Sequence, residues 1–561
     1  MAIGILGNAL SGLTAFQRSL ETTSNNISNA NTEGYSRQRV ELATRPEQFT
    51  GAGYMGNGVE IANITRSYDQ FIANQLRSST STFNEVNSFF SLSSQIDNII
   101  ADESTGLAPA MKSFFDAVDG VANDPASISA RQVMLTQAGS LTQQFNTMSA
   151  RFSDMRKRVN GNLASSVDEV NGFAKSLAEL NVKIVADIGR SSGKQMPNEL
   201  LDQRDALLTK IAEKTDVSFV NQADGSINVF IGKGQPLVLG SYASTLSLQG
   251  SSIDVDHKQI VLNGQDISSQ LSGGEIYGNL RFRDEMLDPA QQQLGLLATG
   301  LAAEFNSTHR SGFDLSGPPA SAGLDFFDLG SPSVQVQTTA SNAGITANFV
   351  APTPPTLSGV LGSSYRLDVI STAPDMFTLT NLSDNTVTTP LGATDLADPP
   401  PATAAINGFN ISFSGTLSIG DSFQISPSFN AAASLKVNSA ITNPRQIAAG
   451  GIAGLPGDNS VALKLAALET KSPMQNGKSS FIQVYGDLVA NVGSQTHAAS
   501  VTKAAQESLL KQAAGAKENI SGVNLDEEAA NLIKFQNSYQ AAAKAVSVAN
   551  SLFDTLIGAF R

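Results

Sequence analysis

Apolar residues recur at every seventh position near the N-terminus. The two columns of this repeat hold Leu6, Leu13, Phe16, Leu20 and Ile27. Several successive heptads of this kind are typical of a helix that pairs with another helix through an apolar seam. The pattern therefore predicts a helix over residues 1–31, with one face that needs a partner.

The last segment of the chain repeats this pattern over five heptads. Its columns contain Leu525, Leu532, Phe535, Tyr539, Val546, Phe553 and Leu556. Burial of one leucine side chain contributes about 1.5–3 kcal/mol, so an uncovered seam of this length favours association. We predict that the N-terminal and C-terminal seams together form an assembly interface.

The N-terminal segment has weak intrinsic helix propensity, because it contains Gly4, Gly7, Gly12 and the pair Asn25-Asn26. Short helices are also marginal in water. We therefore expect both ends of the chain to be mobile in the free monomer and to become ordered on assembly. A two-helix stalk within one chain is the alternative, and it predicts the same seams without a polymer.

Between the two ends, the periodicity changes from helical to alternating and back. Alternation around the Asn57-Gly58 turn predicts a hairpin, and short alternating runs over 216–273 predict further strands. Helical periodicity covers 68–214, with a break at Pro197, and returns at 290–310. The segment 216–273 is therefore expected to be inserted into a helical domain.

These segments predict a multidomain α+β fold with terminal coiled-coil helices, a central helical-bundle domain formed by discontinuous segments, and inserted β-rich domains. The terminal helices and hairpin take residues 1–66 and 506–561; the helical domain takes 67–215, 274–312 and 436–505; the insertions take 216–273 and 313–435.

The second insertion has a composition of its own. Residues 311–435 hold 12 of the 21 prolines, lack Glu and Lys, and contain Arg366 as the one basic residue. Thr, Ser, Val and Pro dominate, which favours strands joined by loops. We predict a surface-exposed β-domain.

Composition excludes several classes of function. The chain has 561 residues, a formal net charge of −14 and no cysteine. The negative charge argues against binding to nucleic acid, which needs clustered Lys and Arg, and the lack of Cys excludes disulfides and thiolate zinc sites. No apolar run reaches the length of a membrane-spanning helix, so we expect no membrane insertion. The apolar N-terminus lacks a basic region before Arg18, so it does not read as a cleaved signal peptide.

The motifs with possible chemistry are weak. Gly51, Gly53 and Gly56 have the spacing of a dinucleotide fingerprint, but a strand-like run follows them where a helix is required. The three histidines are far apart in sequence, and His309 is interpreted as a partly charged residue near a helix end. Acids at 526–528 fit the first turn of a helix. We therefore predict no catalytic, cofactor-binding or metal-binding residues, and a protein that is not an enzyme.

Short motifs border both seams. On the N-terminal side they comprise Asn25-Asn26-Ile27 and then Asn31, Thr32, Gly34, Tyr35, Ser36, Arg37 and Gln38. On the C-terminal side they comprise Asn524-Leu525-Asp526-Glu527-Glu528 and the run 539–544. Both sets resemble signatures of the bacterial flagellar axial proteins, the family of rod, hook and hook-associated proteins. Further runs at 199–205, 283–285 and 457–459 are most similar to the members that join the hook to the filament.

This resemblance implies a structural subunit that forms the junction between hook and filament by helical self-assembly through paired terminal helices. It implies contact with copies of itself, with the hook protein on one side, and with the next hook-associated protein or the filament on the other. It also implies an export chaperone, passage through the flagellar type III export apparatus without signal-peptide cleavage, and an extracellular location. The family implies no cofactor and no reaction.

Three alternatives remain open on sequence alone. Another axial subunit, the hook or distal rod protein, shares the terminal signatures. A wall-cutting hydrolase attached to an axial module needs a placed acid pair, and the 313–435 segment lacks Glu. An adhesive or antigenic module in 313–435 is compatible with a structural subunit.

Overall fold

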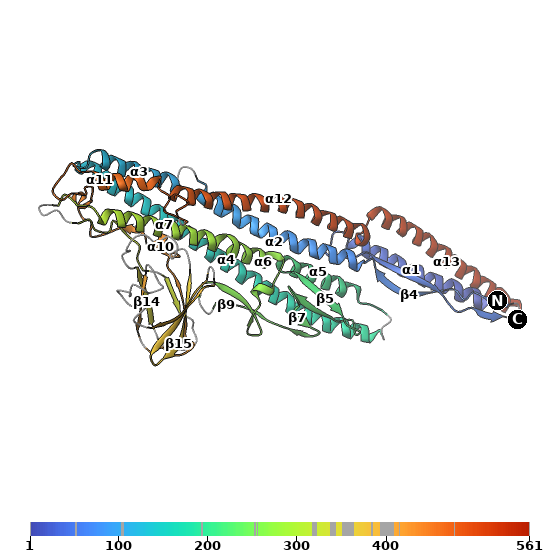
Figure 1. The fold of residues 1–561 in the computed structure, drawn as a ribbon. Coiled ribbons are helices and arrows are strands. Elements are labelled where there is room, and N and C mark those ends of the chain that lie inside the picture. The colour runs from blue at the N-terminus through green and yellow to red at the C-terminus, as the bar shows by residue number, and fades with distance from the viewer. Residues whose placement is uncertain are drawn as a thin grey trace.

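The protein is strongly elongated, with both chain ends at one tip (Figure 1). The computed structural model describes residues 2–50, 53–102, 106–191, 195–251, 254, 256–316, 322–331, 333–336, 344–349, 364–382, 385–392, 409–414, 416–475 and 477–559. Two parts follow one another along the long axis, and a third lies beside them (Figure 1). We call them the stalk, which contains both ends, the helical body, and the β projection (strands within 333–426), which lies on one side of the body.

The stalk is built from both ends of the chain. Helices α1 (Ala2–Ser28) and α13 (Leu525–Ala559) run antiparallel and in contact, and a long hairpin lies against α1 (Figure 1). The hairpin consists of β1 (Gln38–Thr44) paired with β4 (Val59–Arg66), extended by β2 (Gln48–Thr50) and β3 (Gly53–Met55). The expected terminal helices and hairpin therefore pack as one unit.

The expected turn residues of this hairpin have another role. Gly58 directly precedes β4, and the outer end of the hairpin is the β2–β3 pair; residues 51–52 lie outside the described residues. Gly58 has a φ of +87°, and a Cβ on it would lie 2.2 Å from the Ser11 hydroxyl oxygen. The glycine is required because it lets the hairpin approach α1 closely.

The body is a bundle of long helices. Its helices are α2 (Gln70–Ile100), α3 (Leu107–Asn123), α4 (Ile128–Arg190), α5 (Asn198–Lys214), α6 (Gly274–Phe282), α7 (Asp288–Arg310), α10 (Ala431–Ser434), α11 (Ser460–Ala466) and α12 (Phe481–Ser521). A π-helical turn, η2 (Arg283–Leu287), joins α6 to α7, and short 3-10 turns lie at η1 (Ser268–Gln270), η3 (Pro444–Gln446) and η4 (Ala467–Glu469). The 63 residues of α4 give a helix about 95 Å long.

The 216–273 segment forms two small sheets that pack on α4. One has the order β5-β6-β7-β8 and the other β11-β10-β9. Their strands are β5 (Val217–Asn221), β6 (Ile227–Ile231), β7 (Gln235–Leu239), β8 (Tyr242–Ala243), β9 (Leu246–Gly250), β10 (Lys258–Leu262) and β11 (Gln265–Asp266). Buried residues of these strands belong to the same apolar core as the helices, so the sheets are part of the body.

The second insertion has a core of its own. Its main sheet has the order β13-β19-β15-β16-β17, and β14 pairs with β18. The strands are β13 (Ser333–Val336), β14 (Gly344–Phe349), β15 (Tyr365–Thr372), β16 (Asp375–Asn381), β17 (Val387–Gly392), β18 (Phe409–Ser414) and β19 (Ser422–Ser426). Residues between Ile345 and Ile425 form a separate apolar cluster.

Part of the 313–435 segment nevertheless belongs to the body. Strands β12 (Phe327–Asp328) and β20 (Lys436–Val437) pair beside the body, and Phe326 and Phe327 are buried against Phe114 and Phe305. The separately packed projection is therefore shorter than the compositional segment.

Candidate assembly interface and neck

Helix α1 buries a stripe of small side chains. The stripe consists of Ser11, Ala15, Ser19, Thr22 and Asn26, all on one face of the helix. At one end the Val59 N–H donates to the Ser11 hydroxyl (3.2 Å), and at the other end the Asn26 amide donates to the Gln38 carbonyl (2.9 Å). This stripe therefore lies under the hairpin, and the heptad columns lie on another face of α1.

The predicted seam residues are only partly covered. Leu13, Phe16, Leu20, Ile27, Leu532, Phe535, Tyr539 and Val546 are half-buried. Leu6, Leu525 and Phe553 are exposed, and the Leu556 side chain lies outside the described residues. The two helices meet as expected, but one chain does not bury the seams. This partial cover is what an interface with further copies requires.

Further apolar side chains stand on the outside of the stalk. Leu10 is 56% exposed on α1 and Ile533 is 58% exposed on α13, and the hairpin tip exposes Phe49 and Tyr54, whose rings are in edge contact at 5.3 Å. Phe49 and Tyr54 thus form an exposed apolar pair, and exposed apolar patches are typical of interaction sites. The periodicity did not point to the hairpin tip, because a short run holding two aromatic residues carries no helical or strand repeat.

The residues of the N-terminal signature gather at the neck, where stalk meets body. We define the neck as residues 29–37, 67–69 and 522–524. The Tyr35 hydroxyl donates to the Asn26 side-chain carbonyl (2.8 Å), and the Gln38 N–H donates to the same oxygen (2.9 Å). Burial, helped by Asp202, raises the pKa of Tyr35 to about 12, so the hydroxyl keeps its proton and remains a donor at neutral pH.

The other signature residues frame this network. Asn31 and Thr32 are exposed, and Gly34 has a φ of +81°, with its Cα beside Ala206. Asn29, Thr32 and Tyr35 line a shallow pocket of about 300 Å³ together with Asp202 and its neighbours on α5. The signature thus forms the corner where α1 turns into the hairpin.

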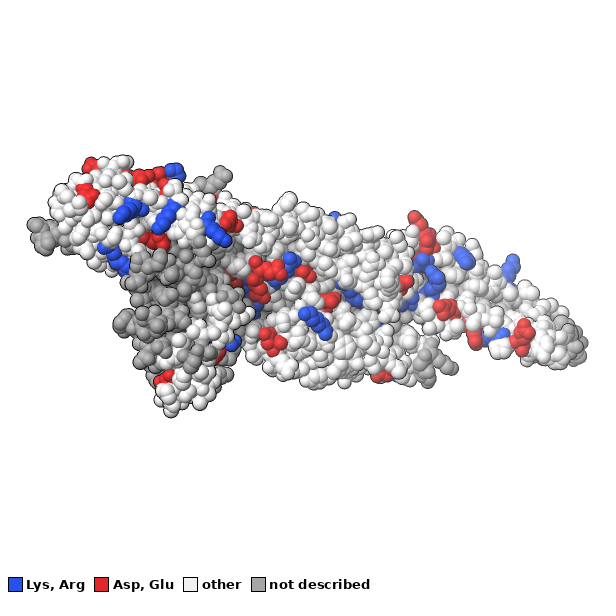
Figure 2. All heavy atoms as spheres, in the orientation of Figure 1, with Lys and Arg blue, Asp and Glu red and all other residues white. Residues whose placement is uncertain are grey.

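Glu528 is the central acid of the neck. Its side chain is 2% exposed and accepts hydrogen bonds from Arg37 (2.7 Å) and Asn26 (3.1 Å). Arg37 also pairs with the exposed Glu527 (2.7 Å), and Asn524 caps α13 by accepting from the Asp526 N–H (2.9 Å). The expectation of acids in the first turn is met, yet Glu528 does more: it joins α13 to α1 and to the neck. On the face in Figure 2, basic and acidic side chains gather near this region.

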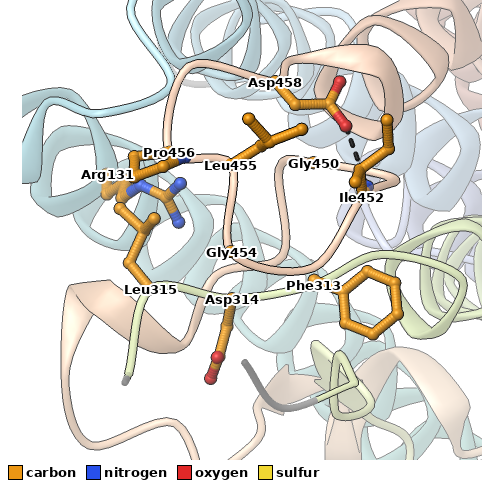
Figure 3. A pocket seen from close by; sticks show the side chains of 10 residues that line it. All are labelled: Arg131, Phe313, Asp314, Leu315, Gly450, Ile452, Gly454, Leu455, Pro456 and Asp458. Atoms are coloured by element: carbon orange, nitrogen blue, oxygen red, sulfur yellow. Dashed lines mark hydrogen bonds between the residues drawn. The ribbon is translucent and has the colours of Figure 1, made fainter. Parts of the chain in front are cut away.

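The polar side chains of a pocket at the far end of the body bond to backbone groups around it. It has a volume of about 310 Å³ and lies under the loop 450–458 (Figure 3). The buried guanidinium of Arg131 donates to the Pro125 and Ile447 carbonyls, and burial lowers its pKa to about 10, so it stays charged. Asp458 accepts from the Gly451 and Ile452 N–H groups (2.8 and 2.9 Å). These polar groups hold the loop in place.

One group of side chains has the composition of a metal site, which the sequence spacing did not indicate. Ligand atoms of His257, Asp284 and Asp288 lie within 4.8 Å of one another. Asp288 is already paired with Arg156 (2.6 Å) and Asp284 with Arg283 (2.7 Å). The guanidinium groups neutralise both carboxylates, and this arrangement accounts for the cluster without an ion.

His309 lies in the last turn of α7, as expected, but the expectation that it carries partial positive charge is wrong. The ring is fully buried, its Nδ1 donates to the Leu324 carbonyl (2.6 Å), and its Nε2 accepts from the Ala448 N–H (2.9 Å). Burial lowers its pKa to about 4, so the ring is neutral at neutral pH.

Among the described residues, no helix is both apolar and long enough to span a membrane.

Comparison with known proteins decides the family. Residues 93–327 match the model of the flagellar hook-associated protein FlgK helical domain. Residues 6–35 match the flagella basal body rod protein model, and residues 518–559 match the flagellar basal body rod FlgEFG protein C-terminal model. Flagellar hook-associated protein 1 of Escherichia coli K12 is 34% identical, with 99% of each chain covered. The chain belongs to the flagellar hook-associated protein 1 family.

Other relatives agree with this assignment. Flagellar hook-associated protein 1 of Bacillus subtilis is 26% identical over 98% of this chain and 97% of its own. The structure of the flagellar hook junction protein FlgK from Burkholderia pseudomallei, 25% identical, superposes with a TM-score of 0.67 and covers 80% of this chain and all of that one. The chain is therefore a structural subunit of the bacterial flagellum, at the junction between hook and filament, and its relatives are structural proteins.

Proposed function

We propose that this chain builds the junction as a helical array in which the stalks of many copies pack side by side and form the inner wall of a tube. The observation that carries the proposal is the apolar surface of the stalk. Half-buried seams and exposed side chains such as Leu10 and Ile533 occur on the same unit that carries the family signatures. When one surface of each stalk packs against a different surface of the neighbouring stalk, the contacts repeat without closing and give an open helical assembly.

The partners proposed for this array are those of the family to which the chain belongs. The hook protein lies on one side of the array, and the next hook-associated protein or the filament lies on the other. The chain reaches this extracellular position through the flagellar type III export apparatus, with an export chaperone and without signal-peptide cleavage. The place of α1 in the stalk supports the last point, because cleavage behind such a segment would remove half of the helix pair.

A single substitution on the stalk tests the proposal. Ile533→Asp places a charge on an exposed part of α13 without disturbing the buried contacts of the monomer. We expect the purified variant to keep its helical circular dichroism and cells that carry it to shed filaments into the medium. Motility and filament retention equal to the parent would contradict the proposal.

The matched control is Ile419→Asp, which changes an isoleucine of the β projection that is at least as exposed as Ile533. We expect this variant to retain filaments. If both variants shed filaments, the effect belongs to lost apolar surface in general and the stalk assignment is wrong.

A further inference from the structure

Helix α5 turns a polar face towards the neck. Asn198, Asp202 and Asp205 are spaced four and three residues apart, so they lie on one side of the helix. Asn198 and Asp202 are buried and the Asp205 side chain is 14% exposed. Asp202 and Asp205 belong to the 199–205 motif, to which the assembly of the stalk assigns no role.

This face holds strand β4 of the stalk hairpin. The Asn198 amide donates to the Ile64 carbonyl (2.7 Å). One guanidinium nitrogen of Arg66 donates to both Asp202 (2.9 Å) and Asp205 (2.6 Å). Arg66 also lies over the Tyr68 ring, 4.1 Å from its centre. Backbone and side chain of the strand are therefore both attached to α5.

The same face holds the neck. The second carboxylate oxygen of Asp202 accepts from the Ser36 N–H (2.9 Å). The next residue, Arg37, donates its N–H to the Ser521 carbonyl (2.9 Å) and accepts from the Ser67 N–H (2.7 Å). The chain crosses between body and stalk at 67–69 and at 522–524. This one segment is bonded to Ser67 in the first crossing and to Ser521, the residue just before the second.

The charges make the arrangement specific. Arg66 and Arg77 face Asp202 and Asp205 in a region where each side chain is at most 14% exposed. Removal of one member of a buried ion pair leaves an uncompensated charge, so such a cluster tolerates one geometry far better than others. Two short crossings without these bonds would form a hinge.

We infer that the polar face of α5 is a clamp that fixes the angle between stalk and body, with Asp202 as its positioning residue. The clamp acts within one chain and needs no polymer, so it goes beyond the proposed function. It makes each subunit rigid across the neck.

Distance measurements between two spin labels on the free monomer test the clamp. The chain has no cysteine, so labels at Ala530→Cys on the stalk and Lys183→Cys on the body are unique, and both positions are exposed. We expect one narrow distance distribution. The double variant Asp202→Asn, Asp205→Asn should at least double the width of this distribution, because the two substitutions keep the side-chain volume and remove the charge.

Three further variants keep the test decisive. Asp116→Asn on α3 neutralises an exposed carboxylate paired with Lys112 and should leave the width unchanged. Asp202→Glu keeps the charge and should stay narrow, whereas a role in packing alone would tolerate Asn and reject the larger Glu. Arg66→Gln removes the charge on the β4 side of the cluster and should broaden the distance distribution in the same way. It replaces the double variant in the test if the double variant loses helix content. A width in either charge-loss variant equal to the parent, or a broad distribution in the parent itself, would overturn the inference.

Discussion

At the scale of single residues, one acid in an apolar helix face decides how the two ends of the chain meet. Glu528 lies in a heptad column that elsewhere holds Phe535 and Ala549, yet it is among the most buried residues of α13. A buried polar residue at such a position is a known means of selecting one alignment of paired helices. Here its partners, Arg37 and Asn26, come from the neck and from α1.

Glu528→Ala should therefore open the stalk locally. Loss of the buried carboxylate removes the hydrogen bonds of Arg37 and Asn26 to it and leaves Arg37 with its exposed partner Glu527 alone, which costs about 1.5–3 kcal/mol for hydrogen bonds to a charged group. Hydrogen exchange of the amides at 529–532 in the monomer measures the change. Glu527→Ala removes the exposed partner of the same arginine, and it should cost no more than about 1 kcal/mol. Equal effects of the two variants would show that burial of Glu528 is unimportant.

His309 should make the body sensitive to mild acid. Its folded pKa of about 4 lies below the ordinary value of 6.5, so the unfolded chain binds the extra proton as pH falls from 6.5 towards 4. This contribution to stability is complete above pH 6.5, and about 2 kcal/mol of it is lost at pH 5.

Denaturant unfolding of the parent and of His309→Gln at pH 7.5 and pH 5 checks this sign. The free energy of unfolding of the parent should fall more between the two pH values than that of the variant. An equal fall in both proteins would mean that the imidazole does not titrate in this range.

At the scale of elements, the stalk is held unevenly along its length. The neck half carries the bonds of Asn26, Arg37 and Glu528, whereas the tip exposes Leu6 and Leu10. The expectation that the ends order only on assembly stays a prediction, and these contacts place the expected mobility in the tip half.

Hydrogen exchange along α1 tests that prediction. In the free monomer, amides at the tip should exchange within seconds, and in isolated hook–filament junctions they should be protected. Amides near Asn26 should be protected in both, which makes them the internal reference. Strong protection across all of Leu6–Ile27 in the monomer would contradict the prediction.

Local patterns predicted the elements well, because each element carries its own repeat. The heptads predicted α1 and α13, and the short alternating runs over 216–273 predicted the strands of the two small sheets. The clamp was not predictable in this way. Ser36 and Asp202 are 166 residues apart and Arg37 and Glu528 are 491 apart, and nothing local marks them as neighbours. The available signal was an acid in a heptad column and a charged run, 202–205, within an apolar helix pattern.

At the scale of the whole molecule, the parts differ in how they depend on one another. The projection around Ile345–Ile425 has its own apolar cluster, and the two sheets of 216–273 share the core of the body. The stalk has no apolar core of its own and does not share the core of the body, because its seams stay half-exposed in one chain. Copies of the same stalk supply the missing cover in the account given above.

Cross-linking in assembled flagella tests this central claim most directly. In the natural cysteine-free background, Leu10→Cys combined with Ile533→Cys places one thiol on each of the two stalk helices, and Ile419→Cys combined with Ile533→Cys moves the first thiol to the β projection. After mild oxidation of isolated hook–filament junctions, we expect disulfide-linked chains from the stalk pair and monomers from the pair that includes position 419. Junctions that assemble normally but yield no linked chains from the stalk pair, or from Phe49→Cys combined with Ile533→Cys tested in the same way, would contradict assembly through the stalk.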